Sequence, residues 1–297
     1  MLTRQKAGKK PAPQAAQPAS TQAPAGDGTL AFPNVRHIIA VGSGKGGVGK
    51  STVAMNLAAA WQRLGWTVGL MDADIYGPSV PTLTGMDGRP DLTEDKRIAP
   101  MDADGIRTMS IGNMTKPGQA LVWRGPMVQG ALMQMLRDVE WGSLDALIID
   151  LPPGTGDVQL TLSQRLKLTG AVIVSTPQDL ALIDARRAMA MFERVAVPVL
   201  GLIENMSVFC CPSCGHESHI FGHGGAASEA EAQGLPFLGE VPLTMPLREL
   251  ADQGKSIVRE LPEDPATESM MAVASTLQAA LDDPARTTRK PPNIVWR

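Results

Sequence analysis

The chain has 297 residues, of which 43% are hydrophobic, so it is long enough for one large α/β domain or two small ones with a complete core. The formal net charge of −3 argues against a broad surface for nucleic acid. No apolar run reaches the length of a membrane span, and the N-terminus shows no secretory leader. We therefore expect a cytoplasmic protein that binds neither nucleic acid nor a membrane.

The two ends of the chain differ in composition from its middle. The first 34 residues are rich in Ala, Pro, Gln, Ser, Thr and Gly, which favours a disordered tail. Basic residues near the start faintly resemble an organellar transit peptide, but the prolines from Pro11 to Pro24 disfavour the amphipathic helix that such a peptide needs. We predict a tail at 1–34, one folded domain at 35–283 and a second tail at 284–297.

The stretch from Val41 to Thr52 fits the phosphate-loop pattern G-x-x-x-x-G-K-[ST]. A buried strand is predicted before it at 37–41 and a helix after it at 51–64, which is the context that such a loop requires. Glycines let the backbone N–H groups turn inward, and the helix N-terminus adds partial positive charge. Lys50 is expected to reach the β- and γ-phosphates and Ser51 to bind Mg²⁺. The predicted nucleotide-binding residues of the loop are Gly44, Lys45, Gly46, Gly47, Val48, Gly49, Lys50, Ser51 and Thr52.

Two later segments carry carboxylates at the ends of predicted strands. The strand at 67–71 runs into Asp72 and Asp74, and the apolar strand at 146–150 ends in Asp150. Because parallel strands deliver such residues to one edge of a sheet, Asp150 is the candidate Walker B ligand of Mg²⁺. Gly154, which follows it, would let the backbone approach the γ-phosphate.

The remaining pattern alternates strands and helices, which predicts a doubly wound, mostly parallel sheet of the P-loop NTPase type. Residues 80–105 show little regular pattern. Further strands are expected at about 106–111, 171–176, 199–206 and 236–241, and helices at about 126–139, 157–168, 180–195, 225–233 and 265–281.

All three cysteines lie in one loop, at 209–223. Cys211 and Cys214 form a C-x-x-C, which supplies two of the four ligands that a tetrahedral zinc or a [4Fe–4S] cluster takes. Cys210 is a poor third ligand, because adjacent residues of an extended chain point apart. A two-fold dimer would supply the missing pair. Spacing alone leaves the cluster, a zinc site that includes His216, His219 or His223, and a redox dithiol open.

Lys45, a second lysine inside the phosphate loop, resembles the deviant Walker A loop of the MinD/ParA/nitrogenase-iron-protein superfamily. The resemblance implies that Lys45 crosses a dimer interface to the partner's nucleotide, so Lys45, Lys50 and Asp74 form the expected catalytic set. It also implies that Asp74 orients the attacking water, that Asp72 lies near Mg²⁺, and that Asn205 contacts the base. Since the chain has no Asn-Lys-x-Asp, the usual guanine reader, ATP is favoured over GTP.

Several motifs together resemble the Mrp/ApbC family over about residues 35–260: DADIYGPS at 72–79, DLPPGTGD at 150–157, ENMS at 204–207, CPSCG at 211–215 and IFG at 220–222. The resemblance implies a homodimer that bridges a labile [4Fe–4S] cluster through Cys211 and Cys214. It further implies ATP hydrolysis coupled to cluster assembly or delivery to apo-proteins. Many members carry a further small N-terminal domain, where this chain has the Pro/Ala-rich segment.

Two other functions remain open at this point. One is a MinD/ParA-type positioning ATPase with a structural zinc at the cysteine loop. Such proteins need a basic DNA face or an amphipathic C-terminal helix, and Pro291 and Pro292 disfavour that helix. The other is a reductase like the nitrogenase iron protein, but its family places cluster cysteines near the switch segments, and no cysteine lies near Asp150 in this sequence.

Overall fold

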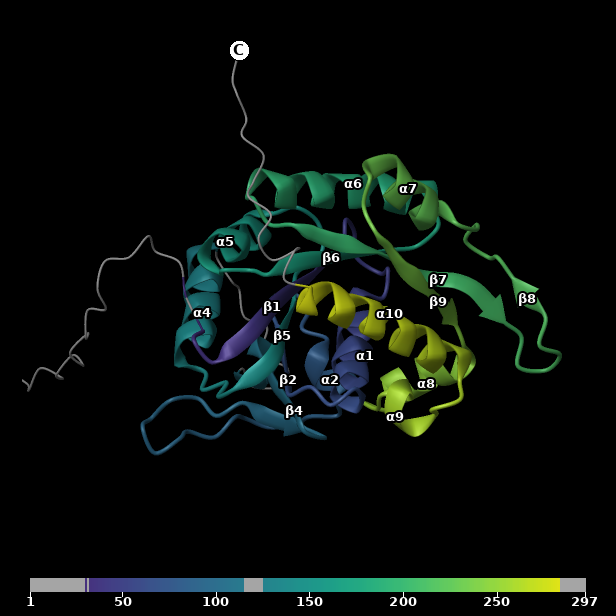
Figure 1. The fold of residues 1–297 in the computed structure, drawn as a ribbon. Helices are drawn as coiled ribbons and strands as arrows, with labels where there is room; N and C mark the ends of the chain where they lie inside the picture. The colour runs from purple at the N-terminus through teal and green to yellow at the C-terminus, as the bar shows by residue number, and fades with distance from the viewer. Residues whose placement is uncertain (1–29, 31, 115–124, 284–297) are drawn as a thin grey trace, which may run out of the picture.

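The computed structural model describes residues 30, 32–114 and 125–283, and their strands form one nine-stranded sheet (Figure 1). Its order is β3-β4-β2-β5-β1-β6-β7-β8, and β9 also pairs with β7. All pairings are parallel except β3 with β4 and β7 with β8. The strands are β1 (Val35–Gly42), β2 (Val68–Asp72), β3 (Met101–Ala103), β4 (Ile106–Ser110), β5 (Leu144–Asp150), β6 (Gly170–Ser175), β7 (Val199–Cys210), β8 (Glu217–Ser218) and β9 (Phe237–Leu243).

Helices cover both faces of this sheet, as Figure 1 shows for α1 and α10 on one side and α4 to α7 beyond the other. Alternate residues of β1 explain the two layers. Ile39 and Val41 belong to the apolar cluster under α1 and α10, whereas Ile38 and Ala40 belong to the cluster under α4 and α6. The helices are α1 (Lys50–Arg63), α2 (Val80–Leu83), α3 (Ile111–Met114), α4 (Gly125–Asp138), α5 (Asp157–Arg165), α6 (Asp179–Arg194), α7 (Gly225–Gln233), α8 (Met245–Asp252), α9 (Ile257–Glu260) and α10 (Pro265–Asp282).

The helix that follows the phosphate loop is fixed by its packing on α10. Trp61 of α1 is fully buried, and its indole N–H donates to the backbone oxygen of Ala274 at 3.0 Å. The start of α10 is defined by Pro265 and by Asp264, whose side chain accepts from the N–H of Ala266. These contacts hold α1 against the sheet and therefore hold its N-terminus at the end of β1.

The predicted doubly wound sheet is confirmed, and each strand and helix predicted from the pattern has a counterpart within a few residues. The sequence pattern missed the short elements β3, β8, α2, α3, α8 and α9. It also ended β7 too early, because this strand continues beyond Met206 to Cys210. One residue of the predicted N-terminal tail contacts the domain: the N–H of Leu30 donates to the backbone oxygen of Arg165 at 2.7 Å. The remaining residues of the predicted tails, 1–29, 31 and 284–297, lie outside the described residues.

No helix among the described residues is long and apolar enough to cross a membrane.

Candidate functional site

The phosphate loop joins the end of β1 to the start of α1 and has the curled backbone that its glycines predict. Gly47 and Gly49 adopt φ of 82° and 78°, a left-handed conformation that favours glycine. Gly44 packs against α6 so closely that a Cβ there would lie 2.0 Å from the carbonyl carbon of Asp184. The loop is therefore held between its own helix and α6.

At the end of the loop, Lys50 forms a buried ion pair with Asp150 of β5. Lys50 is 6% exposed and Asp150 is fully buried, and the Lys50 Nζ also donates to Ser51 Oγ at 3.2 Å. Burial raises the pKa of the Asp150 carboxyl, and the neighbouring Lys50 opposes that rise. The second carboxylate oxygen, Oδ2, is buried without a hydrogen-bond partner. An unpaired carboxylate oxygen beside the Ser51 hydroxyl fits the oxygen ligands that Mg²⁺ prefers.

The two aspartates after β2 have different surroundings. Asp72 is fully buried and accepts hydrogen bonds from the N–H of Asp74 at 3.0 Å, the N–H of Val80 at 3.1 Å and the Ser110 hydroxyl at 3.0 Å. Burial and then the charge of Asp150 raise the pKa of Asp72 to about 7. Asp72 therefore holds the 73–79 loop in place, while Asp74 is partly exposed within that loop.

Two further residues bring separate elements against the phosphate loop. The N–H of Gly154, after β5, donates to the backbone oxygen of Ser43 at 3.0 Å. Asn205 of β7 is 4% exposed, and its Nδ2 donates to the backbone oxygen of Val48 at 2.8 Å. Asn205 was predicted near the end of its strand, but it lies in the middle of β7 and contacts the loop directly.

Lys45 contacts the residue that precedes α6. Its Nζ lies 3.5 Å from Oε1 of Gln178, the residue that precedes α6. The sequence analysis missed two contacts, that of Gln178 with Lys45 and that of the Ser110 hydroxyl with Asp72. No local pattern could indicate them, because the partners lie far apart in the chain.

The cysteines lie in a hairpin at the far end of β7 (Figure 1). Cys210 pairs with Glu217 of β8, and the turn between the strands is closed by a 2.9 Å bond from the N–H of Cys211 to the oxygen of His216. The N–H groups of Ser213 and Cys214 hold the pKa of the Cys211 thiol below its ordinary value, whereas burial raises the pKa of Cys210. The turn thus favours a thiolate at Cys211 and leaves Cys214 exposed.

The histidines of this loop do not complete a metal site within one chain. His219 and His223 contact each other, with ring centroids 4.3 Å apart, and His219 Nδ1 lies 3.3 Å from the oxygen of Ser207. In the described part of the chain, no group of three or more His, Cys, Asp or Glu side chains is placed to hold a metal ion.

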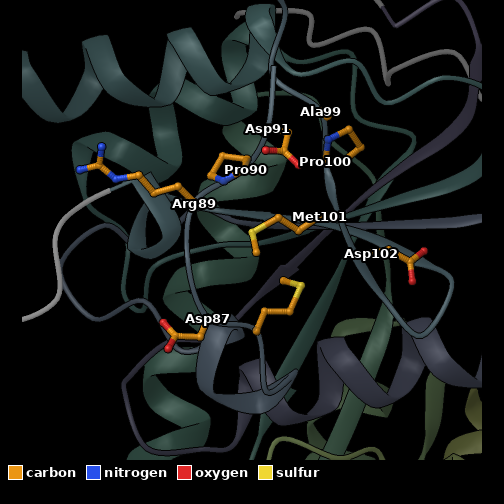
Figure 2. Close-up of a pocket in the computed structure, with 9 residues that line it drawn as sticks. Asp87, Arg89, Pro90, Asp91, Ala99, Pro100, Met101 and Asp102 are labelled. Carbon is orange, nitrogen blue, oxygen red and sulfur yellow. The ribbon is translucent and has the colours of Figure 1, made fainter. Parts of the chain in front are cut away.

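An open pocket of about 400 Å³ lies away from all these residues (Figure 2). Asp87, Asp91 and Asp102 line it together with Arg89 and Met101. Figure 2 shows the three carboxylates spread around the pocket rather than turned toward one point. None of the predicted site residues lines this pocket, so it is separate from the phosphate loop and from the cysteine hairpin.

The curled glycine loop between β1 and α1, with Lys50 at its end and Asp150 on the neighbouring strand, defines a P-loop NTPase. Residues 34–278 match the family described as ParA, NUBPL iron-transfer P-loop NTPase, and the chain belongs to this family.

Named relatives share about half of their residues with this chain. An iron-sulfur cluster carrier protein of Deinococcus radiodurans is 53% identical over 248 residues, which cover 83% of this chain and 70% of that protein. An iron-sulfur protein required for NADH dehydrogenase, mitochondrial, of Arabidopsis thaliana is 48% identical over 86% of this chain and 82% of its own length.

Solved structures agree with the fold. A nucleotide-binding protein from Archaeoglobus fulgidus in complex with ADP has a TM-score of 0.69 and 40% identity, covering 79% of this chain and 92% of its own. The cell division ATPase MinD of Pyrococcus furiosus has a TM-score of 0.61 and 20% identity, covering 82% and 99%, and shows the shared fold alone.

Proposed function

We propose that this protein is an ATP-binding and ATP-hydrolysing carrier that assembles or delivers a labile [4Fe–4S] cluster to apo-proteins as a cytoplasmic homodimer. The observation that carries the proposal is the pair of Cys211 and Cys214 in an exposed turn, on a P-loop NTPase whose relatives are named iron–sulfur cluster carriers. The ATPase domain is proposed to span 35–283. Clients are apo iron–sulfur proteins and cluster assembly proteins.

The cluster is the cargo, and its ligand count supports a dimer. Each chain offers Cys211 and Cys214, and a cluster with four thiolate ligands needs both pairs. The backbone N–H groups aimed at Cys211 stabilise the thiolate that a metal requires. Cys210 belongs to the β7–β8 ladder rather than to the turn, so it is not proposed as a ligand. An exposed cluster bound by a turn is readily passed to an acceptor.

The nucleotide is proposed to bind where Lys50 meets Asp150. Mg²⁺, when bound there, neutralises phosphate charge. Ser51 and Asp150 are its proposed protein ligands, because Oδ2 of Asp150 is unpaired and the Ser51 hydroxyl is adjacent. Lys50 then leaves Asp150 for the β- and γ-phosphates. The loop N–H groups from Gly46 to Thr52 cradle the phosphates, and Gly154 faces the γ-phosphate.

Three further residues are proposed to act on the bound nucleotide. Asp74 is proposed to orient the attacking water, with Asp72 holding its backbone N–H. Lys45 is proposed to leave Gln178 and reach the partner's nucleotide across the dimer interface. Asn205 is proposed to favour adenine at the base.

The test is anaerobic reconstitution of the full chain with iron and sulfide, read by native mass spectrometry. We expect four irons and four sulfides per dimer, because one chain supplies only two suitable thiols. Cys211→Ser or Cys214→Ser should abolish cluster binding, while Cys210→Ser, the matched control, should retain it. ATP binding should survive all three changes, since the hairpin lies outside the phosphate loop. A monomer that carries a complete cluster, or a dimer that holds zinc tightly instead, would contradict the proposal.

A further inference from the structure

Glu204 is a buried carboxylate that fastens the start of α7 to strand β7. Its side chain is fully buried. Oε2 accepts from the N–H of Ala226 at 2.7 Å and Oε1 from the N–H of Gly224 at 3.3 Å. These are donors at the N-terminus of α7, which is 9 residues long, and a negative charge is favoured there. Residues 224–226 also mark the point where the cysteine loop rejoins the body of the protein.

The next residues of the same strand contact the phosphate loop. Asn205 donates to Val48, and its Nδ2 lies so close to Gly49 that a Cβ there would be 2.2 Å away. Met206 adopts φ of 57°, which is strained for a residue other than glycine, and the register of β7 with β9 shifts between Asn205 and Phe209. Because successive strand residues point to opposite faces, β7 contacts the phosphate loop with one residue and the start of α7 with its neighbour.

Both ends of the cysteine loop therefore depend on the same short piece of β7. The loop begins at Phe209, near the end of β7 and just beyond the register shift, and it returns to the body of the protein at Gly224, which is hydrogen-bonded to Glu204. A displacement of β7 at Asn205 moves both ends together. Interiors are close-packed, so such a displacement is passed to the neighbouring groups rather than absorbed.

Helix α6 gives a second connection between the same two places. Its backbone at Asp184 touches Gly44 of the phosphate loop. At α7, a Cβ on Gly225 would lie 2.5 Å from the oxygen of Pro177, which precedes α6. Arg186 of α6 also forms an ion pair with Glu229 of α7 at 2.6 Å. The start of α7 is thus held by elements that both contact the phosphate loop.

We propose that Glu204 is a positioning residue that couples nucleotide occupancy of the phosphate loop to the position of the cysteine hairpin. The proposal rests on the proposed function, because it assigns the route by which the ATPase site acts on the cluster ligands. Phosphates entering the loop shift Val48 and Gly49 against Asn205. Glu204, the preceding residue, then carries the start of α7 and the end of the cysteine loop with it.

The test uses the full chain, reduced and free of iron, with and without Mg·ADP. The alkylation rates of Cys211 and Cys214 by iodoacetamide are measured residue by residue by mass spectrometry, and the ADP affinity is titrated in the same samples. In the wild type we expect the rates to change by about fivefold or more, the lower end of ordinary coupling between sites. In Glu204→Gln, which keeps the shape but loses the charge and turns an amide donor toward α7, the change should fall below about twofold. Its ADP affinity should stay within about twofold of the wild type.

The matched control is Glu231→Gln, the same substitution at an exposed position of α7, which should keep the full response. A second measurement needs no variant. Hydrogen exchange of the Gly224 and Ala226 amides in the wild type should change when ADP binds, because their bonds to Glu204 are the coupling contact.

Three results would overturn the coupling: a full response in Glu204→Gln, loss of ADP affinity in that variant, or thiols and amides of the wild type that ignore bound ADP. None of these readouts involves a cluster, so they leave the carrier proposal standing. A wild type that binds no ADP would sink both.

Discussion

The buried pair of Lys50 and Asp150 makes a stability prediction that can be worked from the structure. Lys50→Met removes the only cation paired with Asp150 among the described residues and leaves a carboxylate with no exposed surface. Breaking a buried pair from one side typically costs about 3 to 5 kcal/mol, because the remaining charge is uncompensated. We expect Lys50→Met to lower the free energy of unfolding of the nucleotide-free protein by about that amount at pH 8.

The assay is a double-mutant cycle followed by urea unfolding. Lys50→Met, Asp150→Asn and the combination Lys50→Met/Asp150→Asn are compared with the wild type. The combined variant should recover most of the stability lost in Lys50→Met, because a neutral amide at position 150 no longer leaves a charge buried. The reasoning fails if the double variant is as unstable as Lys50→Met, or if Lys50→Met costs less than about 1 kcal/mol.

The stability lost in Lys50→Met should depend on pH in a definite direction. Burial raises the pKa of Asp150 in the folded state, and removing Lys50 raises it further, since Lys50 is the group that opposes the rise. A carboxyl with a raised folded pKa destabilises the fold as pH rises above its unfolded pKa. The deficit of Lys50→Met should therefore be largest at pH 8 and shrink toward pH 5. A deficit that grows as the pH falls would contradict the assigned cause.

Two further predictions concern glycine and aspartate positions of the same site. Gly44→Ala should abolish nucleotide binding or folding, because its Cβ would meet the Asp184 backbone at 2.0 Å. The control Gly46→Ala should keep the folded structure, because its Cβ would lie 3.8 Å from Pro153. Equal melting temperatures for the two variants would refute this prediction. The folded pKa of Asp72 is about 7, about 3 units above the ordinary value. The free energy of unfolding of the wild type should therefore fall by about 3 kcal/mol between pH 5 and pH 8, and Asp72→Asn should remove most of this fall. Urea unfolding at both pH values measures the Asp72 effect, and an unchanged slope would show that Asp72 does not titrate there.

Local patterns determined most of the fold. The apolar runs before Gly42 and Asp150 became adjacent parallel strands, β1 and β5, because a run that is hydrophobic on both faces can only be buried between two helical layers. The phosphate loop could also be predicted, since its glycines and the strand and helix beside it are contiguous in sequence. The C-x-x-C could be recognised for the same reason.

Long-range contacts decided what the pattern could not. The spacing of Asp72 and Asp74 did not show which carboxylate would be buried. Asp72 accepts hydrogen bonds from Val80 and Ser110 and is fully buried, whereas Asp74 is partly exposed. Asn205 was predicted to lie near a strand end, but pairing with β8 and β9 extends β7 to Cys210 and places the Asn205 amide on Val48. Glu204 belongs to the ENMS motif, but nothing local indicated what it contacts, because its partners are 20 and 22 residues away. The sequence by itself determined the fold class and the P-loop NTPase family. Only the tertiary structure decided that one strand contacts both the phosphate loop and the cysteine loop, because that contact is formed by packing between segments that are distant in the chain.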